Sequence, residues 1–184
     1  ETDAYPAMAE RGYGWEKLYM ERTCKHYMED FGLDVRIVRF HNIYGPLGTY
    51  DGGREKAPAA LCRKIALAGD GDEIEVWGDG EQTRSFCYID DCVEGLNRLM
   101  DSSWSTPLNL GRDRMVSINE LVGIIAHAAG KTIRIRHELD RPLGVRGRNS
   151  DNSKLREVLG WEPKIPLEDG LAITYDWIRR ELGR

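Results

Sequence analysis

A helix, a strand and a polar turn follow one another between residues 12 and 46, and this order restricts the fold more than any other part of the chain. Apolar residues recur at helical spacing from about Gly12 to Asp30. Residues 34–40 predict a β-strand, which Gly45-Pro46 stops. A helix followed by a buried strand and a polar loop is typical of α/β proteins, in which ligands bind at the carboxyl ends of the strands.

Tyr13 and Lys17 are four residues apart on the predicted helix and therefore share one of its faces. A phenol is a weak base until a neighbouring cation favours its phenolate form and lowers its pKa. A tyrosine one turn before a lysine can thus take a proton from an alcohol whose hydride leaves to a cofactor. The chain has 8 tyrosines, so such a pair also fits an ordinary helix, and the surrounding sequence must decide between the two interpretations.

Length and charge exclude several classes of protein. The chain has 184 residues, of which 41% are apolar and 31% charged, as is typical of a soluble globular protein. The net charge of −5 argues against non-specific binding to nucleic acid. No apolar run is long enough to span a membrane, and residues 1–12 predict a polar loop rather than a secretion signal. Four cysteines without a CxxC pair and four scattered histidines favour a reduced, cytoplasmic protein without a bound metal.

Helices and strands are expected to alternate along the rest of the chain. The sequence predicts helices over residues 57–68, 90–100, 117–127 and 168–182, and a short helix that ends at Gly160. It predicts strands over residues 73–77, 83–89, 107–111 and 132–137. Asp90 is the expected N-cap of its helix. Ser117 and Glu120 have the spacing of a capping box.

Two loops carry clusters of charged side chains. Residues 47–56 contain three glycines and end in Arg54, Glu55 and Lys56. This loop is either a solvated surface segment or a flexible wall that brings these side chains over a bound ligand. Residues 140–152 are dense in arginine, which favours recognition of an anion.

Four motifs in this order and spacing resemble a known family: YGWEK, RFHNIYGP, WGDGEQTRSFCYIDD and LNLG. They are similar to the extended short-chain dehydrogenases/reductases, in the NAD-dependent group of epimerases and dehydratases that act on nucleotide sugars. The resemblance implies an α/β fold: the C-terminal part of a Rossmann-like doubly wound sheet plus the smaller α/β substrate-binding domain of these enzymes. Residues 1–46 and 82–111 would belong to the NAD-binding domain, and residues 47–81 and 112–184 to the nucleotide-sugar-binding domain.

The stretches GGREKAPAALCRK and GVRGRNSDN resemble the branch that epimerises GDP-mannose at carbons 3 and 5 more than the 4-epimerases or 4,6-dehydratases. In that branch Tyr13 would take the proton of the sugar 4-hydroxyl while NAD takes the hydride, and Lys17 would bind the nicotinamide ribose. The resulting 4-ketone acidifies carbons 3 and 5, where Lys56 would add or remove protons as the acid/base partner of a catalytic cysteine. The GDP-sugar would be bound by Asn42, Lys64, Arg84 and Arg148, with Glu55, Lys56, Ala57 and Gln82 as further candidates.

Two choices among these residues stay open. Arg146 lies only two positions from Arg148, so that the preference for Arg148 rests on the resemblance alone. His41 precedes Asn42 and is a further candidate for the site. The resemblance also implies a homodimer that forms through the Tyr13 helix.

Some parts of the family pattern are missing from these 184 residues. No Gly-x-x-Gly-x-x-Gly spacing opens a helix, and the acidic ribose-binding residue, the Ser/Thr partner of the catalytic tyrosine and the catalytic cysteine are not found. We therefore expect a fragment or a truncated relative that is inactive alone. A different 4-epimerase or dehydratase and a non-catalytic sugar-nucleotide-binding module remain as alternatives.

Overall fold

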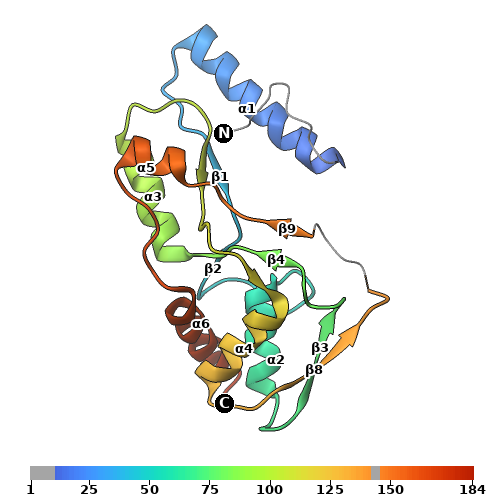
Figure 1. Ribbon diagram of the computed structural model, residues 1–184. Helices are drawn as coiled ribbons and strands as arrows, with labels where there is room; N and C mark the ends of the chain where they lie inside the picture. Colours follow the sequence, from blue (N-terminus) through green and yellow to red (C-terminus); the bar gives the residue numbers. More distant parts are fainter. Residues whose placement is uncertain (1–10, 142–145) are drawn as a thin grey trace.

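The computed structural model describes residues 11–141 and 146–184 as a mixed α/β arrangement (Figure 1). The helices are α1 (Arg11–Phe31), α2 (Ala57–Leu67), α3 (Ile89–Asp101), α4 (Ile118–Ala129), α5 (Ser153–Leu159) and α6 (Leu167–Glu181). The strands are β1 (Val38–Phe40), β2 (Ile43–Tyr44), β3 (Glu73–Trp77), β4 (Thr83–Arg84), β5 (Cys87–Tyr88), β6 (Leu108–Leu110), β7 (Val116–Ser117), β8 (Arg134–Glu138) and β9 (Gly147–Arg148). The loop expected over residues 1–12 lies almost wholly outside the described residues.

Parallel pairing dominates the strands. β1 pairs with β6, β2 with β5, and β3 with β8, all in parallel. β4 is the central strand of a three-stranded sheet, antiparallel to β7 and parallel to β9. Because parallel strands place their carboxyl ends at one edge, the residues that follow β1 and β6 come together.

Two apolar clusters hold these elements in place. In the larger one, α2, α4 and α6 pack together around fully buried side chains such as Ile65, Leu121 and Leu171. The second joins α3 and α5 to β6 through Leu99, Leu108, Leu110, Leu155 and Trp161. In Figure 1, α2, α4 and α6 gather beside the β3–β8 ribbon, while α3 and α5 flank β1.

α1 lies apart from both clusters, at the end of the molecule where β1 begins (Figure 1). Its outer surface is rich in aromatic side chains: Tyr13, Tyr19 and Phe31 are 72%, 71% and 70% exposed. Trp15 and Tyr27 on the same helix are about half exposed, at 50% and 49%. Large aromatic side chains that are exposed in this number are unusual on a free surface and are typical of a binding surface.

Several boundaries differ from the sequence-based expectations. The strand expected over residues 34–40 is confined to β1, and the Arg36 side chain before it bonds to Asp34 and to the carbonyl of Ser102. The strand expected over 83–89 is interrupted between β4 and β5. The expectation that Asp90 caps α3 is wrong, since Tyr88 is the N-cap and Asp90 lies in the first turn.

Other local predictions are confirmed. The capping box of α4 is formed, with the Ser117 side chain accepting from the Glu120 amide and the Glu120 carboxylate accepting from the Ser117 amide. The short strands β2, β7 and β9 were not expected, because two residues are too few to show a periodic pattern.

A pair of glycine substitutions tests the packing of α3. A Cβ at Gly95 would lie 2.6 Å from a Leu110 methyl and 2.8 Å from the Trp161 ring, so Gly95→Ala should destabilise the fold by about 1–3 kcal/mol through overpacking. Gly123 in α4 has open space around its Cβ position, so Gly123→Ala should stabilise by about 0.5–1 kcal/mol. Thermal and urea unfolding measure both. Effects of the same sign would contradict the close approach at Gly95.

Candidate functional site

Arg84 and Arg148 are partners across the parallel β4–β9 pair. In the part of the chain that the structure describes, neither guanidinium meets a carboxylate: Arg84 donates to the carbonyl of Thr83 at 2.6 Å, and Arg148 makes no side-chain hydrogen bond. Burial and the charge of Arg148 lower the pKa of Arg84. Two adjacent cations without a counter-charge favour the binding of an anion with more than one negative charge.

Arg146 occupies a different environment from Arg148. Its guanidinium forms an ion pair with Asp79 at 2.9 Å. The charge of Arg146 is therefore already balanced within the chain. Of the two arginines that the sequence left open, the geometry favours Arg148 as the ligand of an anion.

Asn42 lies next to this pair through Ser85. The Asn42 side-chain amide donates to the carbonyl of Ser85 at 2.8 Å, and the Ser85 amide donates to the carbonyl of Arg148 at 3.1 Å. Asn42 adopts a positive φ of 47°, which asparagine tolerates better than most residues. Three residues predicted from the sequence, Asn42, Arg84 and Arg148, are thus brought together where β1 ends.

Several buried side-chain polar atoms of the described residues lack a hydrogen-bond partner, and two of them belong to His41 and Ser85, the sequence neighbours of Asn42 and Arg84. Within the described ranges they include Nδ1 of His41, Oε2 of Glu55, Oε1 of Gln82 and Oγ of Ser85. A buried polar atom is normally hydrogen-bonded, so such atoms indicate where a ligand or ordered water supplies the missing partner. Glu55 and Gln82 were predicted from the sequence. The Gln82 amide nitrogen is held by the carbonyl of Trp77 at 3.1 Å.

His41 lies between Asn109 and Arg148. Burial, together with the charges of Arg148 and Arg39, lowers the pKa of His41, and a hydrogen bond with Asn109 opposes this shift. The imidazole is therefore neutral at pH 7 and can accept as well as donate a hydrogen bond. A Cβ at Gly111 would approach the His41 Cβ to 2.5 Å, so only glycine fits beside it.

Tyr13 and Lys17 share one face of α1, as their spacing predicts. The Lys17 ammonium lies 5.2 Å from the centre of the Tyr13 ring. Both side chains are exposed on the part of α1 that extends away from the clusters. The pair is accessible to a large ligand.

The lysines of the neighbouring elements have different surroundings. Lys56 is exposed at the N-cap position of α2, and Ala57 begins that helix. The Lys56 ammonium makes no hydrogen bond or ion pair with the described residues and is free to act on a ligand. The Lys64 ammonium instead donates to the carbonyl of Glu75 at 2.7 Å, so that part of its bonding capacity is already used.

Sequence reasoning missed Ser85 and Asn109 as neighbours of the site. Both are buried; Asn109 stands opposite Arg39 across the β1–β6 pair, and Ser85 lies between β4 and β5. Their only sequence signal is that each lies beside or within an expected strand. Among the described residues, no cluster of histidine, cysteine, aspartate or glutamate could hold a metal ion, and no helix has the length and apolarity to cross a membrane.

Comparisons with known proteins agree with this geometry. Residues 1–111 match the NAD dependent epimerase/dehydratase family. The chain is 53% identical over 184 residues to GDP-mannose 3,5-epimerase 1 from Oryza sativa subsp. indica, covering 100% of this chain and 48% of that protein. It therefore spans about half the length of the curated relatives it matches.

Solved structures share the fold. UDP-glucose 4-epimerase from Thermotoga maritima, with UDP-glucose, matches 92% of this chain and 54% of its own, with a TM-score of 0.84 and 29% identity. UDP-glucuronic acid 4-epimerase from Bacillus cereus, in complex with UDP-glucuronic acid and NAD, matches 98% and 57%, with a TM-score of 0.82 and 26% identity. The expected Rossmann-like α/β class is confirmed.

The contrast between Arg146 and Arg148 predicts unequal effects on diphosphate binding. Arg148→Ala should weaken binding of GDP about tenfold or more, because a charge-assisted contact is lost. Arg146→Ala should change the affinity by less than about threefold, since Arg146 is paired with Asp79. Calorimetry at low salt measures both. Equal losses would show that the site does not distinguish the two arginines.

Proposed function

Because the chain belongs to the NAD-dependent epimerase/dehydratase family, we propose that it forms part of a nucleotide-sugar epimerase that converts GDP-mannose to GDP-L-galactose. The carrying observation is the Arg84–Arg148 couple beside Asn42, which meets no carboxylate in the described part of the chain. The identity of 53% to a GDP-mannose 3,5-epimerase supports this substrate. The reaction would be an epimerisation at carbons 3 and 5 through a 4-keto intermediate.

Substrate binding starts from the diphosphate. Arg84 and Arg148 supply the positive charge, and Asn42 contributes its free carbonyl oxygen to the sugar end. Gln82 and Glu55 offer their unpaired oxygens to hydroxyl or amine donors of the ligand. Lys64 assists from α2, although its ammonium also holds the carbonyl of Glu75.

Tyr13 and Lys17 carry the oxidation step. Tyr13 takes the proton of the 4-hydroxyl, and the Lys17 ammonium lies 5.2 Å from the centre of its ring. NAD, when bound, supplies the hydride acceptor and later returns the hydride. The exposed face of α1 fits the nicotinamide ribose, where Lys17 donates hydrogen bonds.

Lys56 carries the proton transfers at carbons 3 and 5. A ketone at carbon 4 makes a carbanion at either neighbour an enolate, so that these protons become removable. The Lys56 ammonium is unpaired and stands at the start of α2, at the end of the 47–56 loop. Placed in this way it can donate a proton to one face of the enolate, while the base that takes the proton from the opposite face would be the catalytic cysteine of the family, which is not found among these 184 residues.

A 4-epimerase or 4,6-dehydratase is the second candidate. It is favoured by the solved structures of 4-epimerases that share the fold at 26–29% identity. A simple 4-epimerase needs the Tyr13–Lys17 pair but no acid and base at carbons 3 and 5. Lys56 therefore separates the two candidates. A non-catalytic sugar-nucleotide-binding module would retain the arginines and need neither Lys56 nor Tyr13.

We also propose that α1 pairs with a second copy of the chain, since its outer surface exposes Tyr19, Tyr27 and Phe31. Light scattering that detects only monomers well above micromolar concentration would contradict this.

The proposed protein has an NAD-binding part, formed by residues 1–46 and 82–111, and a sugar-binding part, formed by residues 47–81 and 112–184. The four cysteines are free in the structure, and a cytoplasmic location is proposed with them.

Substitution of Lys56 separates the two chemical steps. The assay uses a form of the protein that carries the Gly-rich nucleotide-binding unit. Lys56→Met should abolish deuterium uptake from solvent at carbons 3 and 5 and leave oxidation at carbon 4 largely intact, whereas Tyr13→Phe should stop both. Mass spectrometry and NMR of the sugar follow the exchange. Lys164→Met is the control, because Lys164 is an exposed lysine outside the site. Near-normal epimerisation by Lys56→Met would refute the role of Lys56.

The 184 residues alone should not turn over GDP-mannose. The pyrophosphate of NAD is bound mainly by a Gly-rich turn at a helix N-terminus, and the sequence contains no Gly-x-x-Gly-x-x-Gly spacing. We expect NAD affinity no tighter than about 1 mM, or about −4 kcal/mol, and weak, salt-sensitive GDP binding. Calorimetry with each ligand and a product assay with added NAD test this. Micromolar NAD affinity would contradict it.

A further inference from the structure

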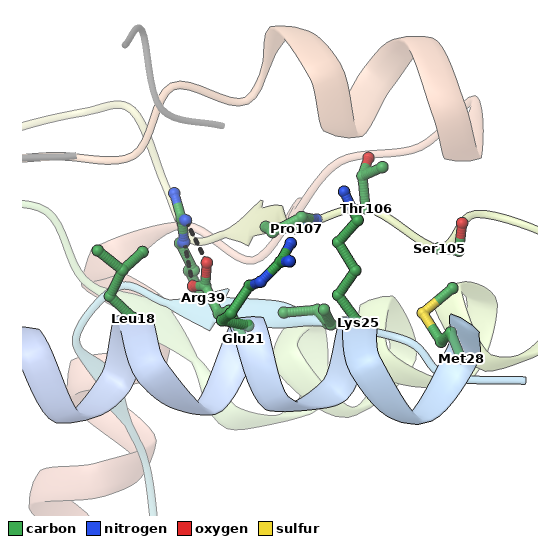
Figure 2. A pocket seen from close by; sticks show the side chains of 10 residues that line it. Leu18, Glu21, Lys25, Met28, Arg39, Ser105, Thr106 and Pro107 are labelled. Carbon is green, nitrogen blue, oxygen red and sulfur yellow. Dashed lines mark hydrogen bonds and ion pairs between the residues drawn. The ribbon is translucent and has the colours of Figure 1, made fainter. Parts of the chain in front are cut away.

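α1 is held against β1 by an ion pair with two hydrogen bonds. Nε of Arg39 donates to Oε1 of Glu21 at 2.6 Å, and Nη2 donates to Oε2 at 2.5 Å. The side chains of Arg39 and Glu21 are only 23% and 18% exposed, so water screens the pair weakly. Figure 2 shows the two bonds as dashed lines between the helix and the strand. Two parallel bonds fix the orientation of both groups as well as their distance.

Apolar packing under α1 is incomplete. A cavity of about 340 Å³ lies between α1 and the strands, and Leu18, Met28, Ile37 and Pro107 contribute its apolar lining. Close-packed side chains would allow a single position of the helix, whereas a cavity allows it to shift. The Glu21–Arg39 pair is therefore the directional contact that places α1.

The sequence around Glu21 opposes a shift of the helix by one turn. The residues four positions before and after Glu21 are Lys17 and Lys25. A slide of one turn, about 5.4 Å, would bring one of these ammonium groups to the position of the Glu21 carboxylate. Either would then face the Arg39 guanidinium, and like charges at short distance repel. A single acidic residue between two lysines thus allows only one register.

This register sets the position of the proposed catalytic pair. Lys17 is one turn and Tyr13 two turns from Glu21, about 6 and 12 Å along the helix. Asn42 follows Arg39 by three residues, about 10 Å along the chain. In Figure 2, α1 runs from Leu18 to Met28 while β1 runs in the opposite direction, so the Tyr13 end of the helix points toward the Asn42 end of the strand.

We propose that Glu21 and Arg39 are positioning residues that hold Tyr13 and Lys17 at the correct distance from the substrate bound at Asn42, Arg84 and Arg148. The inference rests on the proposed function. It assigns a role to two residues that touch neither substrate nor cofactor. Loss of the pair should impair the chemical step and leave the diphosphate contacts unchanged.

The kinetic test uses the protein in a form that carries the nucleotide-binding unit. Glu21→Gln and Arg39→Gln should each lower kcat about tenfold or more, because misplacement of a catalytic group by about 1 Å is costly. KM for the nucleotide sugar should change by less than about threefold, a split expected when only the transition state is affected. The exchanged double variant Glu21→Arg with Arg39→Glu should recover most of kcat.

Glu29→Gln is the matched control. It makes the same chemical change on α1, in an exposed ion pair with Lys25 that touches no strand. Its kcat should equal that of the unaltered protein. A purely structural role of the Glu21–Arg39 pair would lower the melting temperature in the single variants without the kcat-specific loss, and it would overturn the proposal.

Hydrogen exchange on the 184-residue chain supplies a measurement that needs no activity. Amides of α1 should exchange faster in Glu21→Gln, return toward normal in the exchanged double variant, and stay unchanged in Glu29→Gln. Peptides of α2, α4 and α6 should not respond. Unchanged exchange in α1 would refute the positioning role. If α1 responds as expected while no nucleotide sugar is converted, the proposed function fails and the placement of α1 by this pair stands.

Discussion

Two arginines fixed side by side without a carboxylate between them are the constraint on which the candidate site depends. Their separation is imposed by backbone hydrogen bonds: the Thr83 amide donates to the carbonyl of Arg146 at 2.9 Å, and the Ser85 amide to that of Arg148 at 3.1 Å. The β9 segment is fastened in turn by Asn152, whose side chain donates to the carbonyl of Gly111 at 2.8 Å. The backbone hydrogen bonds thus keep the two guanidiniums near each other in spite of their repulsion, and a bound anion would reduce this repulsion.

The same contacts explain why short strands matter here. β4 and β9 have two residues each, yet their pairing sets Arg84 opposite Arg148, and Asn152 beyond β9 bonds to Gly111 at the end of β6. Ser150 is fully buried, and its hydroxyl donates to the side-chain Oδ1 of Asn152 at 2.7 Å, which completes this connection. A buried polar network of this kind stabilises one arrangement of the chain when each member has its partner.

Sequence reasoning succeeded where periodicity or spacing carries the signal. The helical spacing predicted α1 and its Tyr13–Lys17 face, and the Ser117–Glu120 spacing predicted the capping box. It failed where tertiary contacts decide. The register of β4 with β9 depends on segments more than 60 residues apart, so neither the Arg84–Arg148 contact nor the engagement of Arg146 by Asp79 could be derived from the local sequence. The roles of Tyr13, Lys17 and Lys56 remain predictions, because their geometry permits the chemistry without testing it.

The helix that carries Tyr13 also carries the most exposed aromatic surface of the described chain. Phe31 lies eighteen residues after Tyr13, five full turns of an ideal helix, so both side chains project from the same side of α1. A partner that covers Tyr27 and Phe31 would therefore bind the side of α1 from which Tyr13 also projects. Assembly and catalysis would then both depend on α1, and the specific activity would fall on dilution in step with the loss of the assembled form.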